Sequence, residues 1–437
     1  MERRAFLKNA SLAGFGVSNL ESLEDLALAF DQKSGGVRRS GTPRHAAPAS
    51  SMKIAAMTIT RVASPDRPLL NSWDVHDTHF VRTILQLRTE SGLTGVSEGA
   101  AATAGALQAA RPAVLGRDPF QLELLRMSIP NVAAYGMVEV ACLDIIGQAL
   151  NRPLVDLIGG CYRAAAEFSA YVFFIMPEGD DPGVTTPEGA AQQFVEFHRR
   201  YGFLTCKFKG GVLPPEKEVE ALKMMRAALP QARLRIDPNA AWSVQTSLKV
   251  AAAVRDLGME YLEDPTAGHD GMAEVRRNTA VPLATNMVVT KFSDLPVALK
   301  KESVDIILAD HHYWGGMFNS RKVAGICETF GWGLSGHSNN HLGISMAAMA
   351  HLNCALPAVQ FAADTHYPWT SEDVIQGPLL AFQNGTVRIP EGPGLGVKID
   401  PGKLEKLAAN VEKVKNRHEA LMRWNPDHPR NRRGIRY

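Results

Sequence analysis

The stretch Leu204–Gly211, LTCKFKGG, has the pattern of a short β-strand that ends in two glycines. Side chains alternate across a strand, so Lys207 and Lys209 share one face and Cys206 and Phe208 share the other. Two neighbouring ammonium groups repel each other, and on an interior face both would also lose hydration. The alternative is a solvated edge strand that lysines protect from pairing. The rest of the chain decides between these two interpretations.

Apolar runs of strand length recur along the chain, with helix-like stretches between them. The eight candidates are FSAYVFF (168–174), LTCKFKG (204–210), ARLRIDPN (232–239), MEYLEDP (259–265), PLATNMV (282–288), VDIILADHH (304–312), GWGLSGHS (331–338) and VQFAADTH (359–366). Stretches such as EKEVEALKMMRAAL (216–229) have apolar residues at helical spacing. Eight strand–helix units in this order predict an α/β fold, a (β/α)₈ TIM-like barrel over residues 166–390.

The residues before the barrel predict a separate α+β capping domain over 52–165. MKIAAMTITRVA (52–63) alternates like a strand, and FVRTILQLRTESGLTGVSEGA (80–100) predicts a hairpin. Residues 105–150 carry helical spacing. We expect the C-terminal segment, 391–437, to return to this cap.

Residues 1–50 differ from the rest and are expected to be a leader and a linker. ERRAFLK (2–8) resembles a twin-arginine export signal, and ALA (27–29) is a plausible cleavage site. The acidic residues Glu21, Glu24 and Asp25 interrupt the apolar stretch that such a signal requires. Despite this objection we predict export to the periplasm, with a disordered cytoplasmic leader as the alternative.

Composition excludes some classes of function. The 437 residues include 47 Lys and Arg against 45 Asp and Glu, a formal charge of +2, which gives no reason to expect nucleic acid. We expect no membrane span, because no run of 18 apolar residues occurs. The five scattered cysteines predict buried thiols rather than disulfides. Assembly into a homo-oligomer stays open.

Ionisable or amide residues stand at the end of every strand from the second onward, at intervals of 23 to 28 residues: Lys209, Asp237, Glu263, Asn286, Asp310, His337 and Asp364. A single such residue is easily a turn or cap residue. Seven in register predict a polar rim at the C-terminal face of the barrel, where the active sites of this fold lie.

The rim residues predict a magnesium site flanked by two bases. Asp237, Glu263 and Asn286 offer three oxygen ligands from adjacent strands, which suits Mg²⁺ better than zinc. Lys209 precedes these ligands, with a pKa that its neighbour Lys207 and the metal should lower, and His337 follows them, oriented by Asp310. Such an arrangement suits removal of a proton next to a carboxylate, with the enediolate stabilised by the metal and by Lys207.

The chain from Met52 to about Arg423 resembles the enolase superfamily, specifically its glucarate dehydratase group. The motifs KFKGG, RIDPNAAW, EDP, ATNM, LADHHYW, GHSNNH and DTH carry the resemblance in order and spacing. It implies a Mg²⁺-dependent dehydratase of an acid sugar, a glucarate-like diacid, with Lys209 as one base and the His337–Asp310 dyad as the other.

The resemblance also implies a set of substrate contacts. The matching residues are Asn71, His76, Tyr171, Asn239, Ser338, Asn339, Asp364, His366 and Arg417, of which Arg417 would pair with the distal carboxylate. Alternatives remain for three of them: His76 could be a solvated loop residue, Tyr171 could fill the barrel, and Arg417 could be one basic residue among others. The chain departs from the group at His311, where the group usually has proline, and at the short AATAGALQAA (101–110), where Thr103 is a weak match.

Other functions remain open at this point. A racemase or epimerase, or a cycloisomerase, could use the same two opposed bases. A Schiff-base aldolase would use Lys207 or Lys209 as a nucleophile, but three aligned metal ligands argue against it. An exported, non-enzymatic sugar-acid binder would be expected to have lost bases or ligands, and none of the core set is missing.

Overall fold

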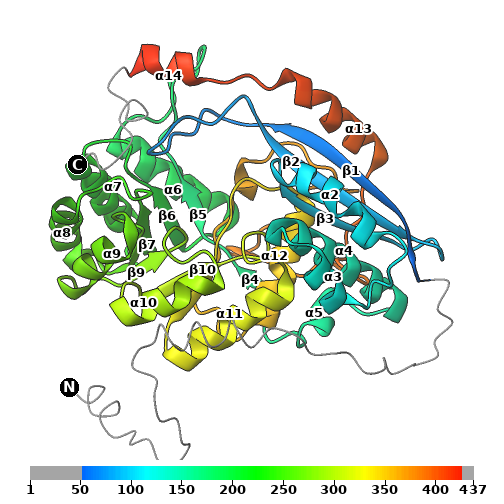
Figure 1. Ribbon diagram of the computed structural model, residues 1–437. Coiled ribbons are helices and arrows are strands. Elements are labelled where there is room, and N and C mark those ends of the chain that lie inside the picture. Colours follow the sequence, from blue (N-terminus) through cyan, green and yellow to red (C-terminus); the bar gives the residue numbers. More distant parts are fainter. Residues whose placement is uncertain (1–51, 426–437) are drawn as a thin grey trace, which may run out of the picture. The chain divides into compact units, whose positions relative to one another are not determined.

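The structure is a computed structural model that describes residues 52–425 (Figure 1). These residues belong to one compact unit. The leader and linker expected over residues 1–50, and the last twelve residues of the C-terminal segment, lie outside the described residues.

The capping part is built on a three-stranded antiparallel sheet, β1 (Ile54–Pro65), β2 (His79–Thr89) and β3 (Thr94–Ala100). The β2–β3 pair is the predicted hairpin, in register from Arg82 opposite Ala100 to Arg88 opposite Thr94. Its turn passes through Gly92 at φ 90°, a conformation that glycine adopts readily. Three helices accompany this sheet: α2 (Thr103–Val114), α3 (Leu122–Ser128) and α4 (Val132–Leu150).

Helix α4 is the core helix of the cap. Among residues 52–425 it is the one helix long and apolar enough to cross a membrane, but most of it is buried inside the protein. Val138, Ala141 and Ile145 pack in one apolar cluster with the sheet residues Leu85 and Leu87. Its apolar composition is therefore explained by burial in the protein.

The barrel is a parallel sheet of seven strands in the order β11-β10-β9-β8-β7-β6-β5. The strands are β5 (Ala170–Val172), β6 (Thr205–Lys209), β7 (Arg233–Asp237), β8 (Met259–Glu263), β9 (Leu283–Thr285), β10 (Ile306–Ala309) and β11 (Gly333–Gly336). The eighth predicted strand is present as an extended segment that closes the ring through the parallel bridges Leu334↔Val359 and Phe168↔Ala363. The TIM-like barrel is thereby confirmed.

Helices alternate with the strands and cover the barrel (Figure 1). They are α6 (Pro187–Tyr201), α7 (Pro215–Ala228), α8 (Val244–Ala253), α9 (Gly268–Arg277), α10 (Leu295–Lys301), α11 (Met317–Phe330) and α12 (Gly343–Ala355). After the barrel, α13 (Pro401–Ala409) packs along β1, and the chain ends its described part in α14 (His418–Trp424). The C-terminal segment thus lies against the capping sheet.

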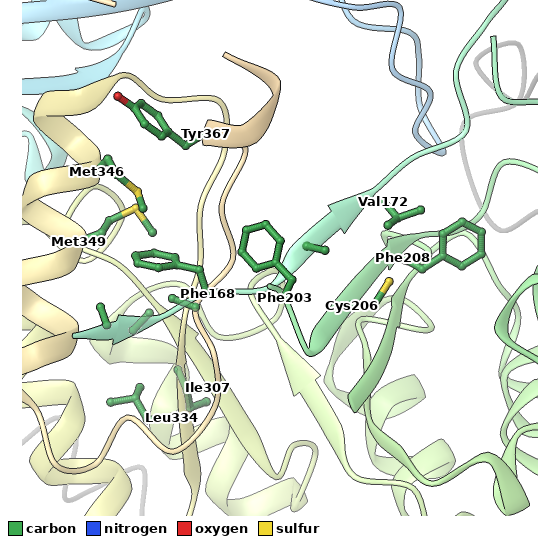
Figure 2. Close-up of a cluster of buried hydrophobic side chains, with 14 of the residues drawn as sticks. Phe168, Val172, Phe203, Cys206, Phe208, Ile307, Leu334, Met346, Met349 and Tyr367 are labelled. Atoms are coloured by element: carbon green, nitrogen blue, oxygen red, sulfur yellow. The ribbon is translucent and has the colours of Figure 1, made fainter. Parts of the chain in front are cut away.

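Strand β6 is an interior strand, which excludes the interpretation as a solvated edge. It pairs with β5 on one side and β7 on the other. Cys206 and Phe208 belong to the apolar cluster drawn in Figure 2, with residues such as Val172. Lys207 and Lys209, on the opposite face, are also buried, with 0% and 8% of their surface exposed.

The cysteines correct one expectation. All five are free thiols, and Cys142, Cys206, Cys327 and Cys354 are buried as predicted. Cys161 is exposed instead; it lies after Gly159 and Gly160 in the segment that follows α5 (Leu154–Leu157).

Candidate active site

The strand-end residues meet at one end of the barrel, beginning with the two lysines. Lys209 lies directly opposite Asp237 in the β6–β7 register, and Lys209 Nζ is 2.6 Å from Asp237 Oδ2. Lys207 Nζ lies 2.5 Å from Glu263 Oε1 and 2.7 Å from Asp364 Oδ2. Two ammonium groups therefore coexist in the interior because carboxylates from three other strand positions neutralise them.

This charge balance keeps both lysines protonated in the protein without a metal ion. Burial lowers the pKa of Lys207, but the carboxylates of Asp364 and Glu263 outweigh it and hold the pKa well above its usual value. For Lys209, burial and Lys207 lower the pKa, but Asp237, Tyr171 and Glu263 together outweigh them, so the pKa of Lys209 is also raised. The sequence predicted a lowered pKa for Lys209. Its neighbour Lys207 does lower that pKa, but Asp237, Tyr171 and Glu263 together raise it by more.

Tyr171 lies beside both ammonium groups. Its hydroxyl oxygen is 3.2 Å from Lys209 Nζ, and its ring centroid is 4.9 Å from Lys207 Nζ. Burial raises the pKa of Tyr171 to about 12, so the phenol is neutral at ordinary pH. The residue therefore does more than fill the barrel, since it offers a polar group next to Lys209.

The oxygen donors predicted to hold Mg²⁺ fit that ion. Glu263 Oε2 is buried and has no hydrogen-bond partner among the described residues, an unsatisfied carboxylate oxygen that a cation would satisfy. Burial raises the pKa of Glu263 well above its ordinary value, and the Asp237 carboxylate raises it further. A bound divalent cation would relieve both effects, because it compensates the negative charge.

The third donor, Asn286, is held in position by the residue after Glu263. Asp264 Oδ2 accepts a hydrogen bond from the Asn286 backbone N–H at 2.8 Å, and Asp264 Oδ1 accepts one from the Thr285 hydroxyl at 2.5 Å. Within residues 52–425 no group of three His, Cys, Asp or Glu side chains forms a ready metal cluster. The predicted set differs from such a cluster because its third oxygen comes from an amide.

His337 and Asp310 form the predicted dyad. His337 Nδ1 lies 2.7 Å from Asp310 Oδ2, and both side chains are buried. The other carboxylate oxygen, Asp310 Oδ1, accepts backbone N–H groups of His312 and Tyr313, each at 2.7 Å. The carboxylate is thus fixed from two sides, and it orients the imidazole.

A pocket of about 290 Å³ opens over these groups. The predicted site residues that line it are Asn71, His76, Tyr171, Lys209, Asn239, Asn286, His337, Asn339 and His366. His366 packs against Tyr171, with ring centroids 4.5 Å apart. Burial, and then the nearby His76, hold the pKa of His366 well below its usual value, so it acts as a neutral ring.

Three residues predicted as substrate contacts lie elsewhere. Asp364 is fully buried beneath the pocket as a partner of Lys207. Ser338 lines a smaller neighbouring cavity of about 50 Å³. Arg417 binds Glu178, with its Nε 2.7 Å from Glu178 Oε1. None of the three is among the described residues that line the 290 Å³ pocket.

The pocket also has a wall that the sequence did not reveal. The additional lining residues are Trp73, Phe173, Met287, Thr290, Tyr313 and Asn340. Trp73 and Tyr313 are large aromatic side chains with 56% and 52% of their surface exposed. This exposure distinguishes Trp73 and Tyr313 from aromatic core residues. The sequence does not show the exposure, because it depends on how the two loops fold.

The cap supports the loop that carries His337. Glu98, at the end of the capping sheet, accepts the backbone N–H of Leu342 at 2.8 Å and of Ser345 at 3.0 Å. Arg82 Nε binds the same carboxylate at 2.8 Å. Glu98 thus occupies the N-terminus of α12, where a negative charge is stabilising, and ties the two parts of the protein together behind the dyad.

Two family models match the chain. The model "Mandelate racemase / muconate lactonizing enzyme, N-terminal domain" matches residues 54–159, and "Enolase C-terminal domain-like" matches residues 189–403. These ranges correspond to the cap and to most of the barrel.

Individual relatives agree with the family models. A probable glucarate dehydratase of Streptomyces coelicolor is 43% identical over 395 residues, covering 82% of this chain and 91% of that protein. A chloromuconate cycloisomerase of Pseudomonas putida is 27% identical, covering 81% and 98%. An enolase from Pseudomonas fluorescens, solved with bound magnesium, potassium and tartrate, superimposes with a TM-score of 0.82 at 38% identity, covering 87% and 99%. The chain therefore belongs to the enolase superfamily, and within that family of enzymes it is glucarate dehydratase-like.

Proposed function

We propose that the protein is a Mg²⁺-dependent dehydratase of an acid sugar. The observation that carries this proposal is the presence of His337, paired with Asp310, in the same pocket as Lys209 and the oxygen donor Asn286. A positioned base next to a cation site is the arrangement that removal of a proton α to a carboxylate requires. Kinship with the probable glucarate dehydratase supports a hydro-lyase.

Asp237, Glu263 and Asn286 would hold the Mg²⁺, which would supply positive charge next to the substrate carboxylate. Lys207 stays an ammonium group among carboxylates and adds positive charge to the floor of the site. It is therefore suited to stabilise developing negative charge and unsuited to accept a proton. The buried acid Asp364 keeps Lys207 in place.

His337 performs the proton transfers in this proposal. Its Nδ1 faces Asp310, so Nε2 is the nitrogen that takes the α-proton, and the electrons of the C–H bond move into the carboxylate as an enediolate. The bond from the β-carbon to its hydroxyl then breaks, and His337 returns the proton to the departing hydroxide. Water leaves, and the enol that remains becomes an α-keto acid.

Epimerisation or racemisation, or cycloisomerisation, is the second candidate, because Lys209 and His337 both line the pocket. These reactions conserve the β-hydroxyl, whereas dehydration loses it. A sugar-acid binder without activity is the third candidate. A binder would not need the two bases, Lys209 and His337, that line this pocket.

The test is a screen of sugar acids, diacids and monoacids of all configurations, with Mg²⁺ and with chelator. Dehydration produces an α-keto acid, which semicarbazide traps as an absorbing product. Mg²⁺-dependent semicarbazone formation from at least one acid sugar is expected. Epimer formation without semicarbazone would replace the dehydratase by an epimerase, and no turnover of any acid would support the binder.

A further inference from the structure

One buried carboxylate joins two side chains of the active-site pocket that come from different parts of the fold. Asp66 follows β1 directly, and 2% of its side chain is exposed. Its Oδ2 lies 2.9 Å from His76 Nδ1 and 2.8 Å from Asn340 Nδ2. His76 belongs to the cap and Asn340 follows β11 of the barrel, and both line the pocket. Asp66, which is not among the described residues that line it, therefore contacts two sides of the pocket from behind.

The chemistry of a carboxylate gives each of these contacts a direction. A carboxylate only accepts hydrogen bonds, so Nδ1 of His76 carries the hydrogen, and Asn340 donates through its amide nitrogen. The other carboxylate oxygen, Asp66 Oδ1, accepts the backbone N–H of Arg67 at 2.9 Å. Asp66 thus satisfies three donors, and Nε2 is the nitrogen of His76 that remains for the pocket.

Neighbouring rings fix the plane of the His76 imidazole but leave two orientations within that plane. The His366 ring stacks beside it, with centroids 5.9 Å apart and an angle of 25°, and the Phe173 ring meets it edge-on at 5.8 Å. A rotation of the imidazole by half a turn about its bond to Cβ would keep this plane and exchange Nδ1 with Cδ2 and Nε2 with Cε1. The hydrogen bond to Asp66 selects the first orientation, because a C–H group at the same place could not replace it.

The backbone of the segment 66–77 is held separately, at its middle. The Leu70 N–H donates to Phe174 O at 2.9 Å. The Met176 N–H donates to Pro68 O at 3.0 Å. Loss of the buried carboxylate should therefore alter the two side chains that it contacts rather than the course of the chain.

We propose that Asp66 is a positioning residue for substrate binding. It orients His76 so that Nε2 faces the substrate, and it holds the Asn340 amide beside that ring. A side chain of the cap and a side chain of the barrel thereby keep a fixed relation to the same bound molecule. The orientation of His76 does not depend on the reaction, whereas its effect on a substrate rests on the proposed function.

The first test reads the tautomer of His76 directly and needs no substrate. Long-range ¹H–¹⁵N NMR of protein with labelled histidine, recorded above neutral pH and assigned through His76→Gln, distinguishes a ring nitrogen that carries hydrogen from one that does not. His76 should carry hydrogen on Nδ1 in the wild type. Asp66→Asn should convert it wholly or partly to the tautomer with hydrogen on Nε2, because an amide offers one acceptor oxygen for three donors.

Asp256→Asn is the matched control for this spectrum, since Asp256 has 89% of its side chain exposed, and it should keep the wild-type tautomer. Two results would overturn the proposal. One is a wild-type His76 with hydrogen on Nε2 alone, which decides the matter even if Asp66→Asn does not fold. The other is an Asp66→Asn variant that folds and shows the wild-type tautomer.

The second test asks whether Asp66 acts through the two side chains. With D-glucarate and Mg²⁺, Asp66→Asn should raise KM on the order of tenfold and lower kcat by less, because His337 is untouched. In a chain that already carries His76→Gln and Asn340→Ala, the same substitution should change KM by less than about twofold, since the side chains that it orients are gone.

An equal effect of Asp66→Asn in both backgrounds, or normal kinetics in the single variant, would make Asp66 a merely structural residue and overturn the proposal. If the wild type does not dehydrate D-glucarate, the proposed function is at fault for this acid. The NMR spectrum then still decides whether Asp66 orients His76.

Discussion

His337 Nδ1 lies 2.7 Å from Asp310 Oδ2, and this contact determines which nitrogen of the imidazole serves the substrate. Because Nδ1 is engaged by the carboxylate, Nε2 is the atom free to accept a proton from the pocket side. His337→Asn should therefore abolish dehydration of the preferred substrate, by about 10²–10⁴-fold or more. Steady-state kinetics with the best acid from the screen checks this, and near-normal turnover by the variant would remove His337 from the mechanism.

Lys209 is the second base of the proposal and should act on the opposite face of the α-carbon. Its pKa is raised in the metal-free protein, but Mg²⁺ at Asp237 would neutralise the carboxylate that raises it most, which would allow Lys209 to give up its proton. In His337→Asn, exchange of the α-proton with D₂O catalysed by Lys209 should persist for the epimeric substrate. Lys209→Arg keeps the charge beside Asp237 but removes the accessible base, so this exchange should disappear. Proton NMR in D₂O measures both variants, and exchange that survives Lys209→Arg would assign it to another group.

Glu263 should be essential for the cation because one of its buried oxygens has no partner among the described residues. Glu263→Gln replaces a carboxylate by an amide, and Mg²⁺ binding measured by calorimetry should fall below detection, together with activity. Glu274→Gln, an exposed acid on α9 paired with Arg277, is the control and should bind normally. Unchanged Mg²⁺ affinity in Glu263→Gln would show that the ion binds elsewhere.

Export predicts that the catalytic fold is complete without residues 1–50. The chain beginning at Met52 should match the full chain in Tm and in kcat/KM, because the cap sheet starts at Ile54. A fall of several degrees in Tm, roughly 3–4 kcal/mol for a protein of this size, would show that the leader contributes to the fold. Fractionation of cells that express the full chain tests the periplasmic location separately.

Glu139 should make stability depend on pH. Burial raises its pKa from 4.5 to about 7, despite hydrogen bonds from the Tyr135 hydroxyl and from backbone N–H groups at the start of α11. Between these pH values the folded chain holds a proton that the unfolded chain has released, so the free energy of unfolding falls as pH rises, by about 3 kcal/mol in total.

Glu139→Gln cannot titrate, so its free energy of unfolding should vary less with pH over this interval than that of the wild type. Urea denaturation at pH 4.5, 5.5, 6.5 and 7.5 measures the difference. Glu274→Gln, an exposed acid on α9 paired with Arg277, should keep the wild-type slope. Identical slopes for Glu139→Gln and the wild type would mean that Glu139 is ionised in the fold.

The sequence alone determined the architecture and most of the reactive groups. Strand ends recur every 23 to 28 residues, and a parallel barrel brings the carboxyl ends of its strands to one rim. Lys209, Asp237 and His337 therefore had to meet there once the strands were recognised. The period-2 pattern of LTCKFKGG placed both lysines on one face and Phe208 on the other. These relations follow from local periodicity and chain order.

Only the tertiary structure decided which of the predicted residues reach the substrate pocket. Asp364 and Arg417 were predicted as contacts, but one neutralises Lys207 and the other is held by Glu178, a residue 239 positions away in the chain. Trp73 and Tyr313 come from different loops and form a wall only when the cap lies over the barrel. Such pairings depend on distances between segments far apart in sequence, which residue spacing within a segment does not encode.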